Sequence, residues 1–157
     1  MVDIIHRVGI KSSVAQAYEA ITSLKGLANW WTEGVTGSSK PDGDGKAGKI
    51  EFTFRTKAGE LLGKFVMEVQ ELKPNEYVRW RCLEGPAEWI GTEIDFRLSQ
   101  QGEQTIIIFG HRNWQEAVEF MSHCSMKWAT FLLSLREYVE TGKGKPSPND
   151  VKIDNWN

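Results

Sequence analysis

Residues 114–141, WQEAVEFMSHCSMKWATFLLSLREYVET, decide the fold of this chain. Their apolar side chains recur at steps of three and four, as on one face of an α-helix, in the series Ala117, Met121, Cys124, Trp128, Phe131, Leu135 and Tyr138. No proline or glycine interrupts the stretch before Gly142, a natural helix end. We therefore predict one helix of roughly 40 Å, and the chain offers no second helix of similar length to cover its apolar face.

The rest of the chain supplies strands to cover that helix. Apolar and polar side chains alternate, as in half-buried strands, over residues 2–11, 49–55, 60–72, 77–83 and 89–99. Residues 104–112 are apolar on both faces and are expected to form a central strand of the sheet. Between the first two strands we predict two short helices, one capped by Ser12 or Ser13 and the next following a break near Gly26. This order predicts an α+β fold in which the helices cover one face of an antiparallel sheet.

Residues 32–48, TEGVTGSSKPDGDGKAG, lack any apolar pattern, and we predict a long mobile loop there. Gly43, Gly45 and Gly48 form a GxGxxG string, but a strand follows where a dinucleotide-binding motif requires a helix. Asp42 and Asp44 begin like a calcium loop, whose twelfth position would be Thr53 instead of glutamate. Neither a dinucleotide nor a calcium ion is therefore expected.

The composition is that of one globular domain. The chain has 157 residues, is 40% hydrophobic and has a formal net charge of −2, which gives no basic surface for nucleic acid. No stretch is apolar enough for a signal peptide or a membrane span, so Cys82 and Cys124 are expected to be buried thiols of a cytoplasmic protein instead of a disulfide. Seven tryptophans require a large core or an aromatic cavity.

Residues 1–141 are expected to form a single domain, and residues 142–157 a linker and tail. The segment KGKPSPND reads as an exposed linker. Val151, Ile153 and Trp156 then alternate in a short tail that we expect to dock on the body of the domain.

A family resemblance rests on several of these segments together. They are residues 14–18 with Ala20 and Ile21, residues 27–31, residues 92–98, residues 105–114 ending in HRNW, and Cys124, Trp128 and Leu135. In this order the chain resembles the SRPBCC or START-like superfamily, whose helix-grip fold wraps a curved antiparallel sheet around a long C-terminal helix. The closer resemblance is to homologues of the activator of the 90-kDa heat-shock-protein ATPase. The segments that carry it build the fold and do not specify an activity.

The resemblance implies a cavity between sheet and helix, and strand alternation together with the apolar stripe of the long helix indicates which side chains face it. Trp31, just before the loop, either closes the mouth of this cavity or pins the short helix to the sheet. The predicted lining is His6, Trp31, Phe52, Phe54, Phe65, Met67, Trp80, Cys82, Phe96, Phe109, His111, Met121, Cys124 and Trp128. The main hypothesis is that this cavity binds a small apolar or aromatic molecule. The alternative that the same side chains simply fill a core stays open at this stage.

Two other functions are weighed against ligand binding. The superfamily includes cyclases and hydrolases, but here only His6 and His111 are expected to face the cavity as polar groups, and no nucleophile is paired with them. The branch also implies a co-chaperone module, which we disfavour because the two-domain eukaryotic activator carries an additional N-terminal domain. The histidines and cysteines lack metal-ligand spacing, so no metal or cofactor is expected. A weak homodimer is left open.

Overall fold

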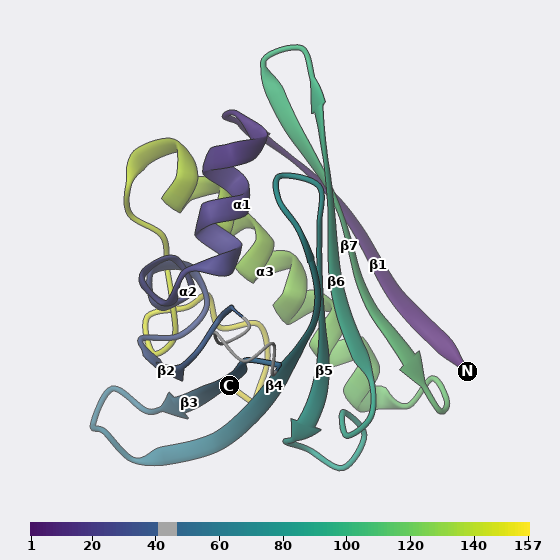
Figure 1. The fold of residues 1–157 in the computed structure, drawn as a ribbon. Helices are drawn as coiled ribbons and strands as arrows, with labels where there is room; N and C mark the ends of the chain where they lie inside the picture. Colours follow the sequence, from purple (N-terminus) through teal and green to yellow (C-terminus); the bar gives the residue numbers. More distant parts are fainter. Residues whose placement is uncertain (41–46) are drawn as a thin grey trace.

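The computed structural model describes residues 1–40 and 47–157 and confirms the predicted helix-grip fold. Seven antiparallel strands form one sheet in the order β1-β7-β6-β5-β4-β3-β2. The strands are β1 (Val2–Lys11), β2 (Gly34–Gly37), β3 (Lys49–Arg55), β4 (Leu61–Lys73), β5 (Tyr77–Glu84), β6 (Glu93–Gln101) and β7 (Gln104–Trp114). The helices α1, α2 and α3 all lie on one side of this sheet (Figure 1).

Two short helices follow β1, as predicted. Ser13 caps α1 (Val14–Thr22) in a capping box, in which its side chain accepts from Gln16 N and the Gln16 side chain accepts from Ser13 N. The break before α2 (Leu24–Trp30) lies at Ser23, which caps the second helix, and not near Gly26 as predicted. Gly26 lies inside α2, where an added Cβ would stand 2.3 Å from the Ala20 carbonyl oxygen, so the glycine permits close packing of the two helices.

The long helix α3 comprises Glu119–Thr141, 23 residues, and begins five residues later than predicted. The predicted start was wrong because β7 continues to Trp114 and pairs with β1 up to that residue. The helix ends at Gly142, whose φ of 89° is the left-handed conformation that glycine adopts without strain. Its length is therefore about 35 Å.

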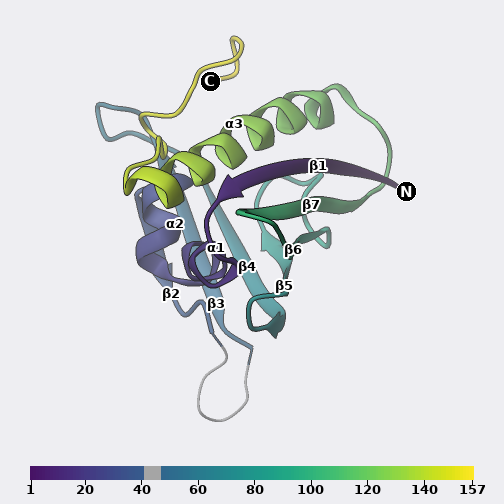
Figure 2. The same cartoon turned by 90° about the horizontal axis from the view of Figure 1, so that it is seen from above.

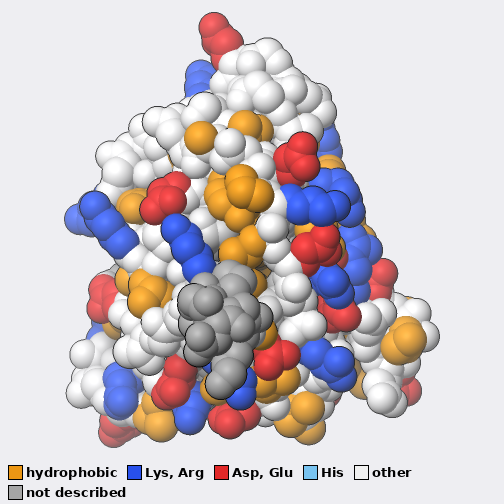
Figure 3. Space-filling view, in the orientation of Figure 1, with side chains coloured by type: hydrophobic (Ala, Val, Ile, Leu, Met, Phe, Trp, Pro, Cys, Tyr) orange, Lys and Arg blue, Asp and Glu red, His pale blue; other side chains and the backbone are white. Residues whose placement is uncertain are grey.

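The sheet curves around α3, as the two views in Figures 1 and 2 show. Register shifts in the β3–β4 and β4–β5 pairs bend this half of the sheet, as β-bulges do. The concave face and α3 enclose the aromatic core, whose largest fully buried side chains include Trp30, Trp31, Trp80, Trp114 and Trp128. On the face shown in Figure 3, acidic and basic side chains are intermixed.

Two predicted loop and strand boundaries were wrong. Within the predicted loop of residues 32–48, Gly34–Gly37 forms the edge strand β2, paired with β3. Its sequence, GVTG, is too short and glycine-rich to show strand alternation. Gly43, Gly45, Asp42 and Asp44 lie outside the described residues. The predicted strand 89–99 begins only at Glu93, because residues 89–92 form a turn that includes Gly91 with a φ of 84°.

The segment after α3 packs against the domain instead of forming an exposed linker. Gly144, Ser147 and Asp150 are buried. Lys145 N donates to Ser134 Oγ at 2.7 Å, and Ser134 Oγ donates to the Trp30 carbonyl at 2.8 Å. The backbone of Ser147 pairs with that of Trp31 and Glu33, so the chain is tied to both α3 and the start of β2.

Candidate functional site

A cavity of about 530 Å³ lies at one end of the aromatic core. Its walls come from α3, the β3–β4 hairpin, the turn before β6 and the C-terminal tail. The lining residues are Trp31, Phe54, Leu62, Gly63, Lys64, Phe65, Gly85, Pro86, Trp89, Phe120, His123, Cys124, Lys127, Trp128, Phe131, Ser147, Asp150, Lys152, Trp156 and Asn157. This volume is within the range of small-molecule sites.

Aromatic rings packed against one another form most of the cavity wall. Trp128 of α3 lies 4.9 Å from Trp31 and is stacked on Trp89 at 5.9 Å, between ring centroids. Trp89 in turn stacks on Phe65 at 4.6 Å, and Phe65 lies 5.0 Å from Phe54. The wall therefore presents fixed ring faces and edges, against which a planar apolar molecule can stack.

A buried hydrogen-bond chain holds Trp128 in this position. The indole Nε1 of Trp128 donates to His111 Nδ1 at 3.1 Å, so that nitrogen must carry a lone pair. His111 Nε2 then carries the proton and donates to Thr92 Oγ1 at 2.8 Å, and that hydroxyl donates to the Trp89 carbonyl at 2.6 Å. Burial lowers the pKa of His111 to about 3, which keeps the ring neutral. His111 thus positions two cavity tryptophans without facing the cavity.

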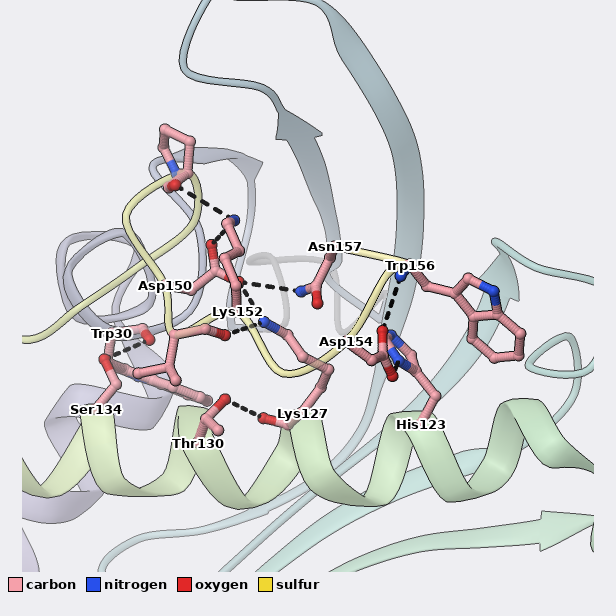
Figure 4. Close-up of polar contacts among 12 residues, drawn as sticks. Trp30, His123, Lys127, Thr130, Ser134, Asp150, Lys152, Asp154, Trp156 and Asn157 are labelled. Carbon is pink, nitrogen blue, oxygen red and sulfur yellow. Dashed lines mark hydrogen bonds and ion pairs between the residues drawn. The ribbon is translucent and has the colours of Figure 1, made fainter.

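The polar side of the cavity is a cluster that joins α3 to the tail (Figure 4). Lys127 is 9% exposed, and its ammonium group contacts Asp150 and donates to the Val151 carbonyl at 2.8 Å. Lys152 donates to the other oxygen of Asp150 at 2.9 Å. Burial opposes ionisation of Asp150, but the hydrogen bonds from the two lysines outweigh it and hold its pKa below the ordinary value.

A second contact fixes the end of the tail at the rim of the cavity. His123 Nδ1 lies 2.6 Å from Asp154 Oδ2, and Trp156 N donates to Asp154 Oδ1 at 2.8 Å. The Trp156 ring packs at 5.2 Å against His123 and at 6.3 Å against Phe120, yet it remains 51% exposed. The tail is therefore one wall of the cavity, held largely by polar contacts.

The structure brings five of the fourteen predicted lining residues to this cavity. They are Trp31, Phe54, Phe65, Cys124 and Trp128. The other nine lie elsewhere on the concave face or on α3, and most fill the core: His6, Phe52, Met67, Trp80, Cys82, Phe96, Phe109, His111 and Met121. His6 Nε2 donates to the Ser125 carbonyl at 3.0 Å and so links β1 to α3. Alternation identified the concave face but not the part of it that stays open.

Several cavity residues were missed by the sequence analysis. Trp89 was predicted as the first residue of the strand 89–99, where alternation assigns it to the face opposite Ile94, but it lies in a turn and lines the cavity. Lys127 is a charged residue on a helix face that was predicted to be apolar. Asp150, Lys152 and Asn157 reach the cavity only because the tail folds back on α3. The one available signal was Trp156, whose alternation with Val151 and Ile153 predicted a docking tail.

The thiols are unreactive and do not assemble a metal site. Cys82 and Cys124 are free and buried, and burial raises the pKa of each to about 12, so neither is a thiolate at neutral pH. Among residues 1–40 and 47–157, no three His, Cys, Asp or Glu side chains lie close enough together to hold a metal ion. In the same part of the chain no helix is long and apolar enough to cross a membrane.

The fold and the cavity define a protein of the helix-grip class, and comparison with known proteins gives its family. Residues 11–140 match the model of the family described as activator of Hsp90 ATPase homolog 1-like protein, and the chain belongs to that family. It is similar to the Aha1 dimer from Colwellia psychrerythraea, a solution structure, with 41% identity and a TM-score of 0.76. That match covers 92% of this chain and 100% of the other.

More distant structures share the fold alone. Protein SSP2350 from Staphylococcus saprophyticus is 14% identical with a TM-score of 0.69, over 91% of this chain and 95% of its own. CalU16 from Micromonospora echinospora is 17% identical with a TM-score of 0.67, over 89% of this chain and 77% of its own. No protein of curated function matches the chain in sequence.

Proposed function

We propose that the protein binds a small, largely aromatic molecule in the cavity between α3, the β3–β4 hairpin and the C-terminal tail. The observation that carries this proposal is the wall itself. Eight aromatic side chains line about 530 Å³ of space beside one buried polar cluster, and they are Trp31, Phe54, Phe65, Trp89, Phe120, Trp128, Phe131 and Trp156. Sites for small organic molecules have this make-up, with many apolar walls and a few polar groups that orient the ligand.

The expected affinity follows from the surface that a ligand would remove from water. A two-ring aromatic molecule that buries roughly 300 Å² of apolar surface gains about 7.5 kcal/mol before the costs of association. Van der Waals contact between the ligand and the cavity wall offsets part of the entropy that the ligand loses on binding. Dissociation constants in the micromolar range are therefore expected for good ligands.

The test fills the cavity at Gly63. This residue of β4 lines the cavity and pairs with Phe54, so its side-chain direction is that of Phe54, and an added Cβ would meet nothing within 4 Å. Gly63→Phe should therefore occupy the cavity and leave the core packed, whereas Gly63→Ala adds a Cβ without filling it. Cys82 was predicted to line the cavity, but it lies in the core, so a larger side chain at that position would not fill the cavity.

Phenylnaphthylamine, an uncharged aromatic probe that fluoresces in apolar surroundings, provides the assay. The wild-type protein and Gly63→Ala should both give saturable binding, and Gly63→Phe should weaken it at least tenfold at unchanged melting temperature. Equal binding by all three proteins would place the probe outside the cavity. Absence of saturable binding by the wild type would contradict the proposal.

The two rival functions make different demands on the same site. An enzyme needs an activated group at the cavity, and His6 and His111, the expected candidates, are both engaged in hydrogen bonds away from it. A co-chaperone would bind a 90-kDa heat-shock protein through its surface, so its binding should be indifferent to Gly63→Phe. A homodimer, as in the relative from Colwellia, is a further proposal that light scattering across a concentration series would test.

A further inference from the structure

The cavity wall contains more positively charged than negatively charged side chains. Within the described chain the wall contains three lysines, Lys64, Lys127 and Lys152, and one carboxylate, Asp150. Lys64 is neutralised from outside the cavity by Glu51 and Glu84, at 3.7 and 3.6 Å. The excess positive charge is therefore located at the other two lysines.

These two ammonium groups share a single carboxylate. Each oxygen of Asp150 accepts from one lysine, and Oδ2 also accepts from Asn157 Nδ2 at 3.4 Å. Two lysines and one aspartate leave a net charge of +1 in this cluster. The charge of the Asp154 carboxylate also acts on Lys127, but Asp154 does not line the cavity and is held at its rim by His123 Nδ1 and Trp156 N.

Lys152 is the member of the cluster that can meet a ligand. Its side chain is 52% exposed, whereas those of Lys127 and Asp150 are 11% and 5% exposed. Among residues 1–40 and 47–157, its one polar contact besides Asp150 is with the Pro148 carbonyl at 3.5 Å, which leaves a donor of the ammonium group for a ligand. Lys152 lines the same cavity as the aromatic rings, so a ligand that stacks on those rings can also accept a hydrogen bond from its ammonium group.

We propose that the cavity selects molecules with an aromatic body and one anionic group, a carboxylate or sulfonate, that binds Lys152 beside the Lys127–Asp150 pair. The ring system would stack on the tryptophan wall and the anion would lie at the tail, so one molecule satisfies both sides of the cavity. This inference rests on the proposed function, which requires only that an aromatic body binds.

Two probes that differ by one anionic group separate the two proposals. Anilinonaphthalene sulfonate has the ring system of phenylnaphthylamine with one sulfonate added, and both report binding by fluorescence. At low salt the sulfonate should bind the wild-type protein about tenfold more tightly than the neutral probe, the effect of one charge-assisted hydrogen bond. Salt should reduce this preference, because Lys152 is half exposed to solvent.

Variants at two lysines of the tail complete the test. Lys152→Gln should abolish the preference, so that the variant binds the two probes with equal dissociation constants. Lys145→Gln makes the same change in net charge at a residue that does not line the cavity and pairs with Glu137 at 3.9 Å, so the preference should persist. Thermal melts of both variants show whether the fold is retained.

Each outcome decides the inference. Equal binding of the two probes to the wild type, or an unchanged preference in Lys152→Gln, would overturn the anion selectivity while leaving aromatic binding in place. Loss of the preference in Lys145→Gln as well would assign it to net charge instead of to the site. Failure of both probes to bind the wild type would overturn the proposed function together with the inference.

Discussion

Acidification should destabilise the protein through His111, although this residue is shielded from solvent. Its ring is 0% exposed and neutral in the folded state, where its pKa is about 3, whereas in the unfolded chain it titrates at 6.5. Below pH 6.5 the unfolded state binds a proton that the folded state does not, so stability falls as the pH falls. The loss is about 2 kcal/mol between pH 7 and pH 5, and it continues to grow until about pH 3.

The assay is urea unfolding of the wild type and of His111→Gln at pH 7 and pH 5. Glutamine offers an amide for hydrogen bonding to Trp128 or Thr92, but it does not titrate. The variant should be less stable than the wild type at both pH values, and its stability should lack the part of the pH dependence that His111 contributes. The difference between pH 7 and pH 5 should be about 2 kcal/mol larger in the wild type. Equal pH dependence in the two proteins would refute the neutral, buried state of His111 and the hydrogen-bond chain that requires it.

The other predictions concern the helix, the tail and the probe signal. Trp128→Ala should reduce the free energy of unfolding by about 3–5 kcal/mol in urea titrations, because the ring is 2% exposed at the centre of the aromatic wall. Lys127→Met should leave the tail attached less firmly, so amide exchange of residues 150–157 should accelerate while that of α3 does not. The pKa of Asp150 in the folded protein lies below its ordinary value of 3.8. The ion pairs of Asp150 should therefore hold the tail in place above pH 3.8, and they should be lost when the pH falls through the folded-state pKa and the carboxylate is protonated. Binding of phenylnaphthylamine should quench tryptophan emission, and a bound probe without quenching would argue against a site beside Trp31 and Trp89.

The fold followed from periodicity, which local sequence expresses directly. The three-and-four spacing of α3 and the alternation of β1, β3 and β5 identified which side chains face the core, and Trp80 and Cys82 do lie there. Periodicity is a property of one element, however, and the cavity is a property of several. Whether a concave position is filled or open depends on where α3 crosses the sheet, which no single segment of sequence specifies.

The polar half of the site was beyond sequence reasoning for the same reason. Lys127 and Asp150 are 23 positions apart, and their contact exists only because the chain reverses after Gly142 and returns along α3. The segment after Gly142, KGKPSPND, is rich in lysine, proline and serine and has the composition of an exposed linker. Its burial comes from backbone hydrogen bonds to Trp31 and Glu33, and backbone pairing leaves little trace in composition.

The most direct test of ligand binding uses the seven tryptophan indole N–H resonances in a proton–nitrogen correlation spectrum of the labelled protein. Four of these side chains line the cavity, namely Trp31, Trp89, Trp128 and Trp156. The other three, Trp30, Trp80 and Trp114, do not. On titration with phenylnaphthylamine, the first four should shift saturably with one common dissociation constant, and the other three should move little. Shifts distributed without regard to the cavity, or no saturable shift at all, would contradict the proposal that this cavity is a binding site.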